Sequence, residues 1–209
     1  MKKNLVIVFF ICSYIAVAAQ DKKVGISFFQ NYSTFRYINS EGNKDDMDYT
    51  IKFGYGLLFQ QVFGKHLLLE GLVLYNNKGA TSSLDLDQLD WSFHYVNAGI
   101  NLGYKFMIGK LYPQLGAGFY YGRLLKADQY IGSAYYDLMV LNEINKNDFG
   151  VNMFGGLEYD YSDNGSLFLK INESIGLLQL EELESGQKIF NRTFSIQLGL
   201  LFPINKNLP

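Results

Sequence analysis

The residues best placed to do chemistry in this chain are Ser92 and His94, which stand two positions apart and close to Asp90. A hydroxyl, an imidazole and a carboxylate are the groups of nucleophilic hydrolysis, because the imidazole takes the proton from the attacking oxygen. This spacing is common by chance, and no second catalytic element accompanies it. The other histidine, His66, begins a separate segment beside a turn. We therefore predict that the protein is not an enzyme.

The beginning of the chain has the pattern of an export signal. Lys2 and Lys3 precede an apolar run that starts at Leu5, and Val17 and Ala19 suit the small-residue cleavage rule. A transmembrane anchor is the alternative, but the run is shorter than the roughly 20 residues that a spanning helix needs. We predict a signal peptide at 1–19 and a mature domain at 20–209.

Composition excludes several classes of site. The single cysteine, Cys12, falls within the predicted signal peptide, and the bulky Phe10 and Ile11 before it do not suit a lipoprotein cleavage site. The mature chain then has no thiolate metal site and no disulfide. Acidic residues outnumber basic ones, 20 to 18, which does not favour a nucleic-acid partner. We predict no metal, no cofactor and no nucleic acid.

The mature chain alternates between apolar residues and small or polar ones with a period of two, which indicates β-strands. Eight strands are predicted, at 24–36, 49–62, 66–77, 91–106, 111–122, 149–161, 165–178 and 189–202. Most are longer than the about five or six residues of a typical strand in a soluble domain. Short turns alternate with long loops, which are 37–48, 78–90, 123–148 and 179–188. This layout is typical of transmembrane barrels.

The polar face of these strands carries few charges. Between the strand ends they are Lys52, Glu70, Lys105, Glu158 and Lys170. A face in water would carry many more, so we interpret the polar face as an enclosed interior and the apolar face as the lipid-contacting exterior. The predicted fold is all-β, an eight-stranded antiparallel up-and-down transmembrane β-barrel. The alternative is a soluble, exported, lipocalin-like ligand binder, which would place its apolar face inside.

The interior of an eight-stranded barrel is just wide enough for its own side chains. We therefore interpret the five interior charges as a structural cluster, and the register of one hairpin predicts a diagonal ion pair between Glu158 and Lys170. Four apolar side chains are also predicted to point inward: Leu58, Leu72, Phe154 and Phe168. A narrow ion channel lined by the interior charges is the alternative.

The last strand ends in QLGLLFPI, which resembles the assembly signal of outer-membrane barrels: polar Gln197, then Gly199, then hydrophobic Phe202 and Ile204. Together with the architecture, this motif makes the mature chain similar to small outer-membrane barrels of the Bacteroidetes type, including the OmpX, OmpA-barrel and PorT-like groups. The resemblance implies a location in the bacterial outer membrane, in contact with membrane lipid and lipopolysaccharide. Families of this kind include adhesins, envelope-stabilising proteins and secretion accessories.

The longest predicted loop, 123–148, is apolar and aromatic. It contains the candidate binding residues Tyr130, Tyr135, Tyr136, Leu138 and Met139. Either it is a protruding hairpin or it is a contact surface, for which a protein is the possible partner. Acidic residues gather in the long loops, where they are either simply solvated or bridge divalent cations to lipopolysaccharide.

The predicted function is a structural or surface-interaction module, for adhesion or as an accessory, that acts through its outer loops and has a plugged interior. A narrow transport barrel and a lipocalin-like binder are the alternatives. One residue does not fit this scheme, because Glu173 lies at a lipid-facing position of its strand. Either a bulge near Asn172 turns it inward, or it lies high enough to reach lipid headgroups.

Overall fold

The computed structural model describes residues 19–39, 41–84, 87–141, 144–181 and 188–204. The predicted signal peptide, apart from Ala19, lies outside these residues, so its assignment stays a prediction. Among the described residues, no helix is long and apolar enough to cross a membrane.

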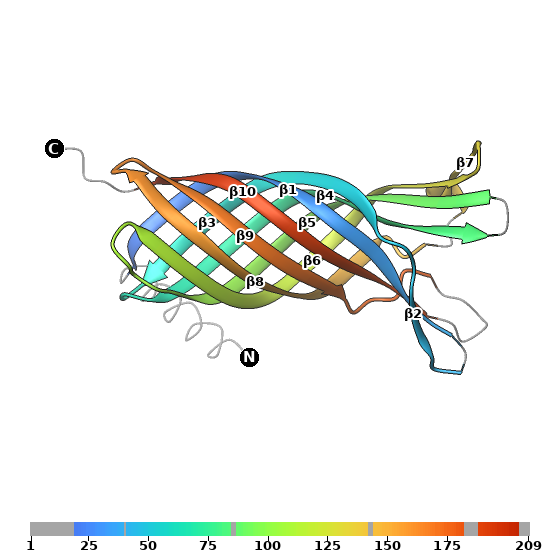
Figure 1. Cartoon of the computed structure of the whole chain (residues 1–209), viewed down its shortest axis with the longest axis horizontal. Helices are drawn as coiled ribbons and strands as arrows, with labels where there is room; N and C mark the ends of the chain where they lie inside the picture. The colour runs from blue at the N-terminus through green and yellow to red at the C-terminus, as the bar shows by residue number, and fades with distance from the viewer. Residues whose placement is uncertain (1–18, 40, 85–86, 142–143, 182–187, 205–209) are drawn as a thin grey trace, which may run out of the picture.

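Most of the described chain is β-structure (Figure 1). The elements are β1 (Ala19–Ile38), β2 (Lys44–Asp46), β3 (Thr50–Phe63), β4 (Leu67–Leu84), β5 (Asp87–Lys105), β6 (Leu111–Ile131), β7 (Ala134–Asp137), α2 (Leu138–Leu141), β8 (Asn147–Ser162), β9 (Gly165–Gly176) and β10 (Lys188–Pro203). Two of the strands, β2 and β7, are short additions that pair with the ends of β1 and β6.

The eight long strands form one closed antiparallel cylinder. Neighbours follow the order β1, β3, β4, β5, β6, β8, β9, β10, and β10 pairs back onto β1. This closing ladder runs from Lys23 opposite Pro203 to Ile38 opposite Lys188. The predicted eight-stranded antiparallel barrel is confirmed.

The two ends of the cylinder differ in their connections. At one end, tight turns contain Gly64 and Gly109, whose φ angles of 59° and 63° lie in the left-handed region that glycine adopts without a Cβ clash. At the other end, the β4–β5 hairpin and the β6–β7 hairpin project beyond the cylinder (Figure 1). By the layout of transmembrane barrels, this second end is the outer one.

Two strand pairs are longer than predicted. The predicted loop 78–90 is instead a hairpin, because the β4–β5 ladder continues to Leu84 opposite Asp87. Likewise, β6 continues to Ile131 inside the predicted loop 123–148, so the protruding-hairpin interpretation holds for that part. The sequence-based ends followed the end of the apolar alternation. Beyond the lipid, however, a ladder needs only backbone pairing and tolerates polar side chains on both faces.

The apolar faces point outward and the polar faces point inward. Phe28 and Phe53 are both 65% exposed on the outer surface, whereas Asn31, Gln60 and Asn101 are almost completely buried inside. This arrangement is the reverse of a soluble ligand-binding barrel, so the lipocalin-like alternative is wrong.

Some glycines of the wall leave room for large interior side chains and for the backbone of the adjacent strand. Substitution of such a glycine tests this packing. A Cβ at Gly116 would lie 2.4 Å from the Leu102 carbonyl oxygen and 2.7 Å from the Phe154 ring. One register position away, a Cβ at Gly155 would meet no described atom within 4 Å. We expect Gly116→Leu to destabilise the barrel by about 1–3 kcal/mol or more through overpacking. The barrel with Gly155→Leu should keep its stability.

The measurement is the denaturant midpoint of the refolded barrel, together with the shift in gel mobility between unheated and heated samples. Equal midpoints for the two leucine variants would contradict the packing of the wall described here.

Candidate functional site

The interior begins, at the short-turn end, with a carboxylate held between two lysines. Glu158 accepts hydrogen bonds from Lys23 Nζ and Lys105 Nζ, both at 2.8 Å. Lys23 Nζ also contacts Asp160 Oδ1 at 3.0 Å and Ser166 Oγ at 2.8 Å. Glu158 is fully buried. Such a group is tolerated inside a protein because opposite charges and hydrogen bonds replace its lost hydration.

A second layer lies around Glu70. This carboxylate pairs with Lys170 and accepts hydrogen bonds from Gln60 Nε2 at 2.9 Å and from Asn101 Nδ2 at 3.0 Å. Strands β4 and β9, which carry Glu70 and Lys170, stand on opposite walls of the cylinder in the strand order. The ion pair therefore bridges the bore.

The predicted ion pair between Glu158 and Lys170 is wrong, because each of the two groups has a partner contributed by another strand. The prediction considered the hairpin as a flat surface on which only neighbouring strands meet. In a narrow closed bore, side chains also reach the opposite wall. The interior membership of Glu70, Lys105, Glu158 and Lys170 is correct, whereas Lys23 of β1 was overlooked at its strand end.

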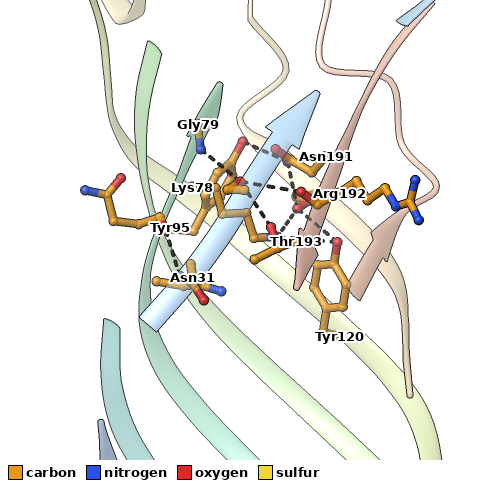
Figure 2. Close-up of polar contacts among 12 residues, drawn as sticks. Asn31, Lys78, Gly79, Tyr95, Tyr120, Asn191, Arg192 and Thr193 are labelled. Atoms are coloured by element: carbon orange, nitrogen blue, oxygen red, sulfur yellow. Dashed lines mark hydrogen bonds and ion pairs between the residues drawn. The ribbon is translucent and has the colours of Figure 1, made fainter. Parts of the chain in front are cut away.

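A third layer lies closer to the outer end. Lys78 Nζ contacts Asp148 Oδ2 at 2.8 Å, and Asp148 also accepts hydrogen bonds from Tyr120 Oη at 3.2 Å and Asn191 Nδ2 at 2.9 Å. Figure 2 shows Lys78, Tyr120 and Asn191 converging from three strands. Sequence reasoning placed Lys78 and Asp148 in loops. Extending the period-two alternation by a few residues would have assigned both to the interior.

An apolar cluster closes the bore above this layer. Its buried members, called the apolar cap below, are Phe35, Ala80, Phe93, Tyr95, Leu124, Ala127, Leu138, Ile144, Leu180 and Ile189. Leu138 comes from α2, which folds back over the mouth. The Asp137 carboxylate accepts a hydrogen bond at 2.9 Å from the Met139 backbone N–H and so fixes the start of this short helix.

The five candidate binding residues of the predicted loop 123–148 divide between two environments. Leu138 is 8% exposed and Met139 packs against the apolar cap, so these two are not free surface residues. The three tyrosines remain outside, with exposed fractions of 42% for Tyr130, 50% for Tyr135 and 45% for Tyr136. The prediction grouped them because all are apolar or aromatic. It could not tell which side chains the helical turn directs into the mouth.

Lys52 is placed differently from the other predicted interior charges. Its Nζ lies 3.2 Å from Asp90 Oδ1, on β5, and the Asp90 side chain is 40% exposed. Lys52 therefore belongs to none of the buried layers. The assignment of Lys52 to the interior charge cluster stays a prediction, because its side chain is only 14% exposed but its ion-pair partner lies outside the buried layers.

The predicted catalytic types meet on the outer surface of the barrel. His94 Nδ1 lies 2.8 Å from Tyr75 Oη, while Ser92 Oγ and Asp128 Oδ2 lie 3.4 Å and 4.0 Å from the other nitrogen, Nε2. A hydrolytic triad needs serine and acid on opposite nitrogens, so that the acid orients the ring while the other nitrogen takes the proton. This cluster places them on the same nitrogen. Its geometry is that of an interfacial hydrogen-bonding group.

Comparison with known proteins addresses the fold. No family model matches this chain, and no curated protein matches it. The outer membrane protein OprG from Pseudomonas aeruginosa is 13% identical, with 90% of this chain and 98% of that chain covered at a TM-score of 0.59. Neisserial surface protein A is 14% identical, with 88% and 97% covered at a TM-score of 0.50.

The chain has the fold of a small outer-membrane β-barrel. At these identities the likeness concerns the fold alone, and the Bacteroidetes type stays a prediction. Within the described part of this barrel, no group of three or more His, Cys, Asp or Glu side chains could hold a metal ion.

Glu173 lies on the outer surface of the barrel, near its outer end. It stands opposite Phe194 on one side and Met153 on the other, and its carboxylate accepts a hydrogen bond from Arg192 Nη2 at 3.0 Å. The ladders run through Asn172 without a register shift. The alternative of a bulge that turns Glu173 inward is therefore wrong, and the charge is balanced by an outward-facing arginine.

The bridge across the bore leads to a prediction about stability. Glu70→Gln and Lys170→Met should each lower the free energy of unfolding by about 3–5 kcal/mol, because each leaves the other charge buried and unpaired. The double variant should lose less than the sum, with a coupling energy of about 0.5–3 kcal/mol in a double-mutant cycle from denaturant titrations.

The outer pair of Glu173 and Arg192 provides the matched control. Both side chains are about one-third exposed, at 35% and 38%, so their coupling energy should lie within about 0–1 kcal/mol. Additive losses at Glu70 and Lys170 would contradict the bridge.

Proposed function

We propose that this protein is an exported outer-membrane barrel that acts at the cell surface through its outer hairpins, while its interior stays closed. The observation that carries the proposal is the layered closure of the bore. Three charged layers and the apolar cap follow one another from the short-turn end to the outer mouth. Membrane lipid and lipopolysaccharide surround the barrel, and the surface partner is a protein.

The closed bore argues against transport of solutes. Each carboxylate of the three layers, at Glu158, Glu70 and Asp148, is buried and bound by lysine at short distance. Opening a path would separate these pairs inside a low-dielectric interior, where an unpaired charge costs several kcal/mol. An interior of this kind stabilises the cylinder.

The outer hairpin offers the exposed groups that recognition uses. Tyr130 and Tyr135 hold their rings 5.4 Å apart across the β6–β7 ladder, and Tyr136 and Val140 extend the exposed apolar surface. Tyrosines are enriched in protein interfaces because a rigid ring gives large contact area at a small loss of side-chain freedom. We call Tyr130, Tyr135 and Tyr136 the tyrosine patch.

The patch is held in place by a charged neighbour. Tyr135 Oη donates a hydrogen bond to Asp128 Oδ1 at 2.9 Å, and Lys126 Nζ contacts the other carboxylate oxygen at 2.7 Å. Donation to the carboxylate raises the pKa of the Tyr135 hydroxyl, so the phenol stays protonated across the physiological pH range.

A narrow channel is the second candidate, and one observation favours it. Several buried side-chain atoms below the cap, on Gln60, Gln114 and Asn152, have no protein partner among the described residues. Buried polar atoms of this kind are ordinarily met by water. Ordered water between the charged layers is the starting point from which a conducting path would be built.

Site-specific photo-crosslinking tests the surface role. A benzoylphenylalanine at Tyr136, in intact cells, should form a discrete protein adduct. The same probe at the cap residue Leu138 should react within the chain, and at the lipid-facing Leu115 it should react with lipid. Tyr135→Ala should reduce the Tyr136 adduct, since truncation of an interface anchor costs about 2 kcal/mol, or roughly thirtyfold in affinity. The probe is also placed at Tyr130 and at Tyr135. If the barrel folds but none of these three positions forms a protein adduct, the proposal is contradicted.

Conductance tests the closed interior. Purified protein in planar bilayers should insert without stable single-channel steps, because the buried ion pairs occupy the bore. Steps whose size changes with Lys105→Glu would support the channel instead. Stable steps that are unchanged by this variant would also contradict the expected silent insertion.

A further inference from the structure

The wall of the barrel is interrupted between β3 and β4. Their ladder runs from Phe63 opposite Leu67 to Gly54 opposite Asn76 and stops there, although both strands continue. Beyond this point β3 stays paired with β1, and β4 stays paired with β5. The next contact between the two segments is the isolated bridge from Asp48 to Thr81. We call the facing segments 50–53 and 77–80 the seam.

The seam is out of register and therefore cannot close by simple sliding. Asp48 and Gly54 are six positions apart along one side, whereas Asn76 and Thr81 are five positions apart along the other. Extending the ladder upward from Gly54 would place its pairs one residue away from the bridge. The interruption is a consequence of this mismatch.

Side chains of β1 bind two of the backbone groups of β4 that β3 leaves unpaired. The Gly79 N–H donates to Ser33 Oγ at 3.0 Å, and the Asn77 carbonyl accepts a hydrogen bond from Asn31 Nδ2 at 2.8 Å. Backbone groups at membrane depth need such partners, because lipid offers none. The seam is thus a stable opening in the ladder.

A hollow of about 630 Å³ lies along the outer surface of the seam. Its apolar lining includes Phe28, Phe53, Tyr55, Ile196 and Leu198, which belong to the lipid-facing surface of three neighbouring strands. A volume of this size is within the range of small-molecule and lipid-sized sites. Because the hollow opens on the lipid-facing surface, the molecules that can fill it are those of the bilayer.

The outer end of the hollow is polar and carries both signs of charge. Lys52 lines it and reaches Asp90, at 3.2 Å. Gly79 has no side chain, and this leaves room for Lys52 to cross the seam. A Cβ at position 79 would lie only 3.2 Å from Lys52 Cε. Asn77 also lines the hollow, and its Oδ1 accepts a hydrogen bond from Ser92 Oγ at 3.2 Å.

The geometry points to a binding site for one zwitterionic phospholipid at the seam. An acyl chain lies in the apolar hollow, the phosphate meets Lys52, and the ammonium of the headgroup meets Asp90. The neighbouring plus and minus charges complement a headgroup that carries both signs. A purely anionic headgroup would gain the lysine but face the aspartate. This site is independent of the tyrosine patch and of any protein that binds there.

Fluorescence quenching by brominated phospholipid tests the site in a bilayer. The single tryptophan is first removed by Trp91→Phe, and a reporter is placed in the hollow by Tyr55→Trp. Leu115→Trp is the matched control on another strand, since Leu115 is 54% exposed and Tyr55 is 55% exposed. Brominated phosphatidylethanolamine is then titrated into phosphatidylglycerol vesicles.

The fluorescence of the Tyr55→Trp reporter should be quenched more strongly than the mole fraction of brominated lipid in the vesicles predicts. Quenching of the Leu115→Trp control should be proportional to that mole fraction. Adding Lys52→Gln should weaken the preference about tenfold, which corresponds to about 1.4 kcal/mol for the lost phosphate contact. Lys126→Gln, which removes an outward lysine paired with Asp128 outside the hollow, should leave the preference unchanged. Identical curves for the two reporters would overturn the site.

Native mass spectrometry of the unaltered chain gives a second measurement that needs no tryptophan replacement. During delipidation the barrel should retain one phosphatidylethanolamine in preference to phosphatidylglycerol, and Lys52→Gln should lose this retention. Equal retention of both lipids, or retention that survives Lys52→Gln, would overturn the assignment. Neither result bears on the tyrosine patch, so failure of the lipid site and failure of the surface role remain distinguishable.

Discussion

Inside a bilayer, a backbone N–H or C=O group without a partner costs several kcal/mol, because no water is present to replace the lost hydrogen bond. The ladder between β1 and β10 answers this requirement by removing the edges of the sheet. The seam is the informative exception. Where β3 and β4 separate, Asn31 and Ser33 of β1 bind two of the freed backbone groups of β4. The wall can open there because backbone pairing is replaced.

Closure with eight strands also determines the chemistry of the interior. The bore is so narrow that charged side chains must find their partners within it, often on the far wall. Glu70 and Lys170 illustrate this relation, and Glu158 does so with two lysines. The same narrowness allows α2 to close the mouth with a few apolar side chains. A barrel filled in this way leaves its outer hairpins as the accessible part of the molecule.

Much of this architecture was accessible from the sequence, because alternation with period two is a direct consequence of strand geometry. It predicted the number of long strands, the outward apolar face and the interior position of Glu70, Lys105, Glu158 and Lys170. The alternation did not predict which interior charged side chains form ion pairs with one another, because the register within a hairpin does not determine contacts across the cylinder. The contact of Lys52 with Asp90 was not predicted, because the break between β3 and β4 depends on a register mismatch. No single-strand pattern records such a mismatch.

The division of the apolar outer segment was also beyond the sequence. Leu138 and Tyr136 belong to the same apolar and aromatic segment and stand two positions apart, yet one is buried in the apolar cap and the other is exposed. Their fates depend on where β7 ends and α2 begins. The strand ends were also predicted too early, because the lipid-facing alternation stops at the membrane whereas the β4–β5 hairpin continues beyond it.

The ladder that completes the cylinder joins the two ends of the chain, and this has a consequence for biogenesis. Ser27 and Gln197, whose side chains are hydrogen-bonded at 2.9 Å, are 170 residues apart. During synthesis and export, β1 must therefore wait with an unpaired backbone edge and an exposed apolar face until the last strand is available. Such an edge is a template for aggregation, and contacts so distant in the chain form slowly. A holding chaperone and a membrane assembly factor that recognises the last strand would shorten this exposed interval.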